Sequence, residues 1–165
     1  MIKMKVMGIA IDTRTGSPIV ILRDYEDRRA LPIWIGSAEA SAIIRTVEGI
    51  PVTRPMTHDL IVQIISDTGY KVEKVEICDV EEETYYADIY LSDGERELVI
   101  DARPSDAIAV AIRCDADIFV TAKVLAEGAI STDKEKDEEE ANNFKEFIKD
   151  LKPSDFQQFL DENQR

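Results

Sequence analysis

Apolar residues recur along this chain with two different periods, and the change from one period to the other occurs twice. In the first part, short segments rich in β-branched residues alternate loosely between apolar and polar positions, as β-strands do. These segments are 4–12, 19–22 and 30–35. Apolar residues then take the helical spacing i, i+3, i+4 and i+7, at Ala40, Ile43, Ile44 and Val47. We therefore expect three strands and a helix that Ser37 caps and Gly49 ends.

The same order of periods returns in the second part of the chain. Strand-type segments cover 72–80, 85–91 and 97–102. Asp93 and Gly94, between the last two segments, are a strong signal for a tight hairpin. A helical face follows at Ala107, Val110, Ala111 and Cys114. Pro104 suits the first turn of this second helix, because its missing N–H has no partner there in any case.

Residues 98–109 echo residues 31–42 position by position. Leu31 corresponds to Leu98, Ile33 to Ile100, Ala40 to Ala107 and Ala42 to Ala109, while Glu39 corresponds to Asp106. This echo predicts an α+β fold built from a duplicated β3α unit, with repeats at about 4–49 and 70–115. The two copies differ where Trp34 and Gly36, which suit packing, are replaced by Asp101 and Arg103.

The remaining segments link the repeats and extend beyond them. Thr57 is a plausible N-cap for a linking helix at 57–68. Residues 131–140 form a polar, acidic linker. A helical tail with an apolar stripe follows, at Phe144, Phe147, Ile148 and Leu151. We expect one domain at 1–130 and an appendage at 131–165.

Composition narrows the class of protein. The 165 residues carry a net charge of −14, which is unusual for a nucleic-acid binder, so a polyanionic substrate would need a local basic site or bridging metal ions. No apolar run approaches a membrane span, and the start of the chain lacks the features of a signal peptide. We expect a cytoplasmic protein that does not associate with membranes. Cys78 and Cys114 lie far apart and are expected to be buried thiols.

Residues 101–106 are the strongest candidate for chemistry, because they join a strand end to a helix start. The free N–H groups of a helix start favour an anion such as phosphate, and Arg103 can add a bidentate contact. Asp101 and Asp106 offer oxygen ligands to a hard divalent cation such as Mg²⁺. The alternative is structural, with Asp106 balancing the helix dipole and Asp101 pairing with Arg103.

His58, the one histidine of the chain, is the second candidate. Near a helix start the dipole disfavours the protonated imidazole, which leaves a neutral ring for base or ligand duty. Thr57 and Asp59 beside it are explained by helix capping. No phosphate-binding loop, dinucleotide fingerprint, nucleophile elbow or CxxC pair occurs.

Residues 31–36, 54–60 and 101–109 together resemble the bifunctional nuclease domain family, over about residues 4 to 130. The resemblance implies a duplicated β3α fold with layered sheets around helices (β/α/β) and a homodimer. Plant relatives in this family act on both DNA and RNA. The resemblance also gives the polar positions to carry over, which are Glu39, Arg54, His58, Asp59, Asp101, Arg103 and Asp106.

We assign roles to these positions by inference. His58, Asp101 and Asp106 are the candidate catalytic residues. The candidate metal ligands, for Mg²⁺ or Mn²⁺, are Asp101, Asp106, Asp59 and Glu39. The candidate substrate-binding residues are Arg54, Arg103 and Ser105.

Two hypotheses from different classes remain. The first is a metal-dependent nuclease that hydrolyses phosphodiester bonds of DNA and RNA. The second is a noncatalytic dimeric module that binds a partner protein or a small anion, in which the motif residues are structural. Convergence of His58, Asp101 and Asp106 on one cleft would favour the first hypothesis. Carboxylates buried against Arg54 or Arg103 would favour the second.

Overall fold

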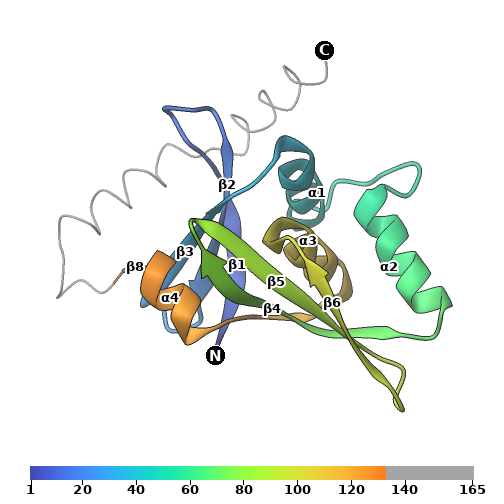
Figure 1. Ribbon diagram of the computed structural model, residues 1–165. Coiled ribbons are helices and arrows are strands. Elements are labelled where there is room, and N and C mark those ends of the chain that lie inside the picture. The colour runs from blue at the N-terminus through green and yellow to red at the C-terminus, as the bar shows by residue number, and fades with distance from the viewer. Residues whose placement is uncertain (133–165) are drawn as a thin grey trace.

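The computed structural model describes residues 1–132, which form one mixed sheet of eight strands with four helices (Figure 1). The helical tail expected beyond the acidic linker lies outside the described residues. The strands are β1 (Ile2–Ile11), β2 (Pro18–Asp24), β3 (Arg29–Trp34), β4 (Lys71–Glu81), β5 (Thr84–Ser92), β6 (Glu97–Ala102), β7 (Asp117–Val120) and β8 (Ile130–Ser131). The helices are α1 (Ser37–Val47), α2 (Thr57–Asp67), α3 (Pro104–Cys114) and α4 (Ala122–Gly128). The predicted α+β class is confirmed.

The order β-β-β-α occurs twice along the chain, as β1-β2-β3-α1 and β4-β5-β6-α3. The two triplets are antiparallel meanders that stand on opposite sides of β7 in the sheet order β6-β5-β4-β7-β1-β2-β3-β8. β7 pairs in parallel with β4 and antiparallel with β1, so it joins the two meanders. A common origin of the two halves stays a prediction, and neither β7 nor α4 was expected from the sequence.

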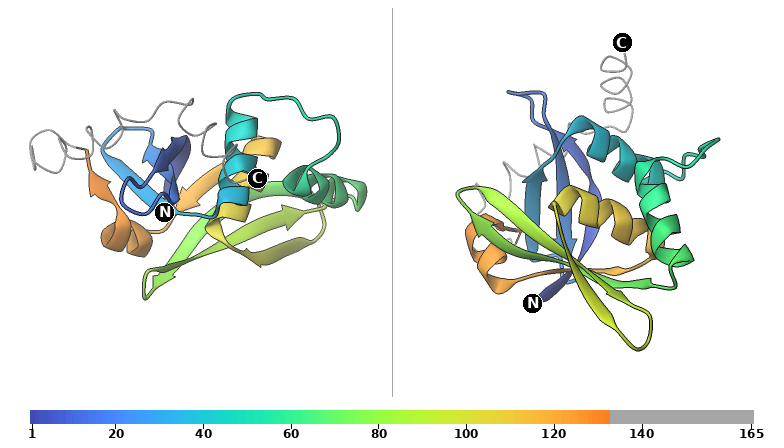
Figure 2. Two further views of the ribbon diagram at one scale, coloured as in Figure 1. Left: turned by 90° about the horizontal axis from the view of Figure 1, so that it is seen from above. Right: turned by 45° about the vertical axis from the view of Figure 1, so that its right-hand side comes forward.

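The sheet curls strongly, as α4 demonstrates. This helix packs against both β3 and β4, which several strands separate in the sheet order. At Gly128, an added Cβ would meet both Tyr85 of β5 and Leu31 of β3. In the right-hand view of Figure 2 the β4–β5 hairpin passes in front of the first meander, and in the left-hand view it lies below that meander. Two layers of strands are therefore parts of one bent sheet.

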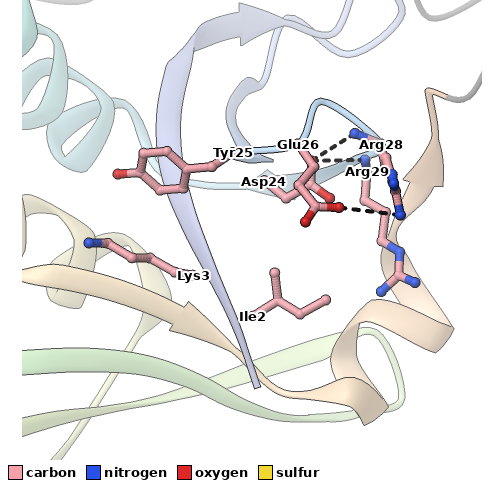
Figure 3. Close-up of a pocket in the computed structure, with 7 residues that line it drawn as sticks. All are labelled: Ile2, Lys3, Asp24, Tyr25, Glu26, Arg28 and Arg29. Carbon is pink, nitrogen blue, oxygen red and sulfur yellow. Dashed lines mark hydrogen bonds and ion pairs between the residues drawn. The ribbon is translucent and has the colours of Figure 1, made fainter.

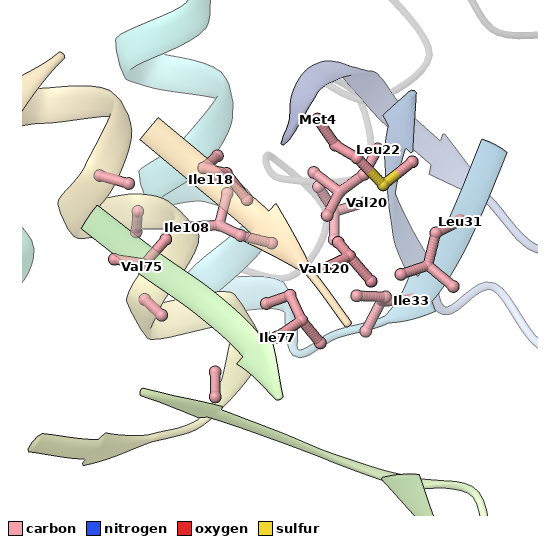
Figure 4. Close-up of a cluster of buried hydrophobic side chains, with 14 of the residues drawn as sticks. Met4, Val20, Leu22, Leu31, Ile33, Val75, Ile77, Ile108, Ile118 and Val120 are labelled. Atoms are coloured by element: carbon pink, nitrogen blue, oxygen red, sulfur yellow. The ribbon is translucent and has the colours of Figure 1, made fainter. Parts of the chain in front are cut away.

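One continuous core fills the inside of the curl (Figure 4). Alternate residues of each strand point into it, as the two-residue period requires. Its fully buried members include Met4, Leu22, Leu31, Ile77, Ile108 and Val120. A second cluster (Ala10, Ile19, Ile21 and Ala30) lies on the other face of the first meander, so β2 is buried on both faces.

Helix ends test the capping predictions. Gly49, with φ of 64°, follows α1 as expected, and Pro104 opens α3. The predicted caps Ser37 and Thr57 are wrong, because both are already inside their helices and Gly36 and Met56 hold the N-cap positions. The carboxylate of Asp59 accepts the backbone N–H of Met56 at 2.9 Å, so a side chain three residues downstream does the capping.

None of the helices in residues 1–132 is both long enough and apolar enough to cross a membrane.

Candidate functional site

The candidate site is a pocket of about 880 Å³ where the N-terminal ends of α1, α2 and α3 meet strand β6. α3 packs against both other helices, and the three lie together in Figures 1 and 2. Five of the predicted site residues line this pocket: Glu39, His58, Asp101, Arg103 and Asp106. Each helix start presents free N–H groups and the positive end of its dipole, so the three together favour an anion.

A chain of polar contacts crosses the pocket from α2 to α1. His58 Nε2 lies 2.9 Å from Asp106 Oδ1, and the imidazole is buried. The other carboxylate oxygen of Asp106 accepts a hydrogen bond from Arg103 Nε at 2.9 Å. Arg103 Nη2 in turn donates to Glu39 Oε1 at 2.6 Å. Arg103 therefore connects two carboxylates from different helices, and His58 attaches α2 to this network through Asp106.

The protonation states of the polar residues in the pocket depend on their contacts with one another. Burial alone would raise the pKa of Asp106, but hydrogen bonds from His58 and Arg103 outweigh it and hold the pKa below its ordinary value. The hydrogen bonds to Asp106 and Glu39 raise the pKa of Arg103. Asp106 is therefore an ionised carboxylate at neutral pH, directed at a ring nitrogen of His58.

This contact fixes which nitrogen of His58 is available. A neutral imidazole that donates Nε2–H to Asp106 has its acceptor lone pair on Nδ1. Nδ1 makes no hydrogen bond within the described part of the chain. A carboxylate that orients an imidazole is the arrangement that general bases use. His58 is thus positioned to take a proton from a water or hydroxyl in the pocket.

Asp101 borders the pocket from a different direction. On β6 it pairs with Asp88 of β5, whereas Ile100 pairs with the buried Ile89. Alternate residues of a strand face opposite sides, so Asp101 lies on the sheet face that carries Asp88, at the rim of the pocket. Asp101 is exposed, and it makes no ion pair or side-chain hydrogen bond with the residues described.

Asp59 is engaged elsewhere. It lies next to His58 but does not line the pocket. The backbone N–H of Met56 and the guanidinium of Arg113 hold the pKa of Asp59 below its ordinary value. Arg113 Nε contacts Asp59 Oδ1 at 2.8 Å, so this carboxylate joins α2 to α3.

Arg54 and Ser105, the other predicted substrate-binding residues, are not brought into the pocket. Arg54 is exposed in the connection between α1 and α2, and Ser105 is buried in the first turn of α3. Neither lines the pocket wall.

The predicted ligands do not form a preassembled metal cage. Across residues 1–132, no group of three or more His, Cys, Asp and Glu side chains is placed to hold a metal ion. Both oxygens of Asp106 already accept hydrogen bonds, and Glu39 accepts from Arg103. Mg²⁺, however, commonly binds through one or two carboxylates, several waters and substrate phosphates. Asp101 has the free carboxylate for that kind of site.

Arg113 was not identified from the sequence, although this residue connects the three helices that form the pocket. Its side chain is 7% exposed, and its guanidinium also donates to the carbonyl oxygens of Ala109 at 2.8 Å and Ala42 at 3.0 Å. A basic residue in the last turn of a helix is explained by the helix dipole alone. Two of its three partners are backbone carbonyl oxygens, which every residue carries, so the residue types in the sequence do not reveal these contacts.

Comparison with known proteins adds the family. The sequence model of the bifunctional nuclease domain matches residues 20–133. An uncharacterized protein of Mycobacterium tuberculosis is 38% identical over 162 residues, covering 93% of this chain and 97% of that protein. Bifunctional nuclease 2 of Arabidopsis thaliana is 30% identical over 113 residues, which cover 67% of this chain and 34% of that protein.

A relative from rice has a similar identity and a similar coverage. Bifunctional nuclease 2 of Oryza sativa subsp. japonica is 29% identical over 117 residues, covering 68% of this chain and 36% of its own length. The chain therefore spans about a third of each of these plant proteins. The family match includes the helices and strands that line the pocket. The chain belongs to the bifunctional nuclease domain family.

Proposed function

We propose that this protein hydrolyses phosphodiester bonds of DNA and RNA in the pocket at the helix starts. The observation that carries the proposal is the convergence of His58, Asp106 and Arg103 on one pocket that three helix N-termini also face. The family supports a nuclease-related function.

The chain's own residues supply binding and proton transfer. Backbone N–H groups of the helix starts and the guanidinium of Arg103 contact the phosphate oxygens. His58 accepts a proton from the attacking water through Nδ1, and Asp106 holds the ring in the required orientation and stabilises the imidazolium that forms. Glu39 and Asp106 orient Arg103, and its side chain is 65% exposed, so the guanidinium is accessible to a phosphate in the pocket.

We further propose that a divalent cation, Mg²⁺ or Mn²⁺, joins the site together with substrate. Asp101 would hold it, with phosphate oxygens and water completing its coordination. Such an ion lowers the pKa of a bound water and offsets charge on the phosphate. The cation would also reduce the repulsion between a polyanionic substrate and this protein, whose net charge is −14.

The test is a cleavage assay on highly purified protein. Single-stranded DNA and RNA are incubated with wild type, with Asp101→Asn, and with Asp115→Asn as a matched control, each with Mg²⁺, with Mn²⁺ and with a chelator. Asp115 is exposed at the C-terminal end of α3 and does not line the pocket. We expect metal-dependent cleavage that Asp101→Asn abolishes and Asp115→Asn keeps. Absence of cleavage by wild type would refute the nuclease, and intact cleavage by Asp101→Asn would refute the role of Asp101.

A noncatalytic anion-binding module is the second candidate function, and one observation favours it. The pocket residues also tie helices together, since His58–Asp106 joins α2 to α3 and Arg103–Glu39 joins α3 to α1. In such a module, inorganic phosphate would bind and raise the melting temperature, while purified protein would leave DNA and RNA intact. Cleavage lost in Asp101→Asn at unchanged melting temperature would exclude the module.

We propose a homodimer assembled through the edge strand β6, whose apolar side chains are exposed on both sides of the sheet, and the exposed apolar side chains of α2. β6 is an edge strand, and its side chains Leu98, Val99 and Ile100 are 40%, 55% and 45% exposed. Leu60 and Ile64 of α2 are 52% and 55% exposed. An open apolar edge invites pairing, and a two-fold axis lets two such edges cover each other. Ile100 also lines the pocket, so a second copy would border it.

Light scattering after size exclusion tests the assembly. We expect a dimer for wild type and for the control Val47→Glu, which alters another exposed valine, 48% exposed on α1. Val99→Glu should give a monomer. A monomeric wild type at micromolar concentration would contradict this interface. We also propose a cytoplasmic location, in keeping with two free cysteines at Cys78 and Cys114.

A further inference from the structure

A second hollow lies away from the pocket, at the start of β1 and the turn between β2 and β3. It has a volume of about 560 Å³ and is lined by Ile2, Lys3, Asp24, Tyr25, Glu26, Arg28 and Arg29. Figure 3 shows Tyr25 and Lys3 on one side, Arg28 and Arg29 on the other, and Ile2 between them. Strands β1 and β2 stand on the opposite side of β7 from β6, which borders the candidate active site.

Tyr25 is an exposed aromatic ring that carries two cations. The residue is 58% exposed. Lys3 Nζ lies 5.5 Å and Lys5 Nζ lies 5.3 Å from the ring centroid. Contacts of this kind orient the ring and keep positive charge beside it. An aromatic face bordered by cations is the chemistry that binds a nucleobase together with its phosphate.

The acidic residues around the hollow are largely occupied. The carboxylate of Asp24 accepts the backbone N–H groups of Arg28 at 2.8 Å and Arg29 at 3.3 Å, so it shapes the turn. Glu26 pairs with Arg28 at 3.3 Å, and Asp117 pairs with Lys3 at 2.8 Å.

Two cations are left over by these contacts. Lys5 and Arg29 have no acidic partner within residues 1–132. Arg29 lines the hollow, Lys5 lies beside Tyr25, and Asp24 is the lining carboxylate without a cationic side-chain partner in the described part of the chain. One positive charge therefore remains in excess around Tyr25, in a chain whose net charge is −14.

From this arrangement we propose that the hollow binds single-stranded nucleic acid, with a base stacked on Tyr25 and phosphates contacted by Lys5 and Arg29. An unpaired strand fits because bases in a duplex have both faces covered by their neighbours. The proposal rests on the proposed function for its ligand class, since a strand held here is the class of molecule that the pocket would cleave. The hollow itself performs no chemistry.

Fluorescence anisotropy on the full chain measures this binding directly. The probe is a labelled oligothymidine in low salt with a chelator, so that binding is recorded without cleavage. We expect Tyr25→Ala to weaken binding about tenfold, as expected for the loss of one stacked base, and Tyr25→Phe to bind like wild type. Tyr86→Ala is the matched control, because Tyr86 is another exposed tyrosine, 40% exposed on β5.

A second pair of variants tests the phosphate contacts. We expect Arg29→Ala to weaken binding and to reduce its salt dependence, since each phosphate contact releases counterions. The control is Arg14→Ala, whose side chain is 87% exposed on the hairpin between β1 and β2. Thymidine monophosphate and inorganic polyphosphate serve as competitors. Competition by the mononucleotide alone identifies a nucleotide pocket, and equal competition by polyphosphate identifies a charge patch without base recognition. Either result overturns the proposed strand site.

The outcomes separate this proposal from the active site. If purified protein cleaves but Tyr25→Ala binds and cleaves like wild type, the hollow is not a strand site and the nuclease stands. If Tyr25-dependent binding occurs without any cleavage, the strand site stands and the nuclease fails. A wild type that does not bind the oligonucleotide overturns the strand site.

Discussion

Replacing Arg113 should disrupt the site from outside the pocket. This side chain joins all three helices that form the pocket, because it contacts Asp59 of α2, the carbonyl of Ala42 in α1 and the carbonyl of Ala109 in its own helix. Arg113→Ala removes these contacts together. It also leaves the Asp59 carboxylate beside His58 with no cation from α3, and it leaves the two carbonyl oxygens without this donor.

The expected cost follows from the burial of the two partners. Breaking a buried ion pair by removing one partner costs about 3–5 kcal/mol. The Arg113 side chain is 7% exposed but that of Asp59 is 33% exposed, so water recovers part of the loss and we expect the lower end. About 3 kcal/mol corresponds to a melting temperature about 10 °C lower for a domain of this size. Arg113→Lys keeps the charge but loses the planar fork, and we expect an intermediate cost.

Urea denaturation of the full chain provides the measurement. Arg14→Ala, which alters an exposed arginine, should stay within about 0.5 kcal/mol of wild type. Adding Asp59→Asn to Arg113→Ala should cost less than the two single changes together, because the residues share one interaction. An Arg113→Ala variant as stable as Arg14→Ala, or strictly additive effects with Asp59→Asn, would show that Arg113 does not connect the helices.

Two further predictions concern titration. Because the contacts of Asp106 hold its pKa below the unfolded value of about 3.9, its stabilisation is complete above that pH and is lost as the pH falls through the folded pKa. Asp106→Asn should therefore flatten the acid limb of the pH–stability curve, and an unchanged limb would contradict this account. Burial, with Asp88 nearby, raises the pKa of Cys78 to about 11, so iodoacetamide at pH 8 should label Cys78 far more slowly in native protein than in urea. Similar labelling rates in the two states would refute that placement of the thiol.

Local signals predicted most of the fold. The two-residue and helical periods located the six long strands and the helices α1, α2 and α3, because these elements are long enough for a repeat of apolar and polar residues to be recognised. β7 and α4 were not predicted, because elements of four and seven residues are too short to show a repeat of apolar and polar residues. β7 pairs with strands from both halves, so the joining of the two meanders into one sheet rests on long-range pairing that no local pattern encodes.

The site was predicted in part for a similar reason. Asp106 was selected because it lies where a strand end meets a helix start, His58 because it is the one histidine and lies near a helix start, and Glu39 because the family resemblance carries it over. All three line the pocket. Arg103 was predicted to contact an anion, but its contact with Glu39 crosses from α3 to α1 and depends on how the helices pack. Asp101 and Arg103 both line the pocket, Asp101 as a residue of β6 and Arg103 from the position just beyond the last strand residue.

The rate of phosphodiester cleavage by His58→Gln tests the central claim most directly. Glutamine retains a hydrogen-bonding group for Asp106 but cannot act as a base at neutral pH. Wild type and variant are compared in single-turnover cleavage of single-stranded DNA with Mn²⁺, at matched folded fractions. General-base catalysis by His58 predicts a rate lower by about 10²–10⁴-fold in the variant. Equal rates would contradict the assignment of the pocket as the active site.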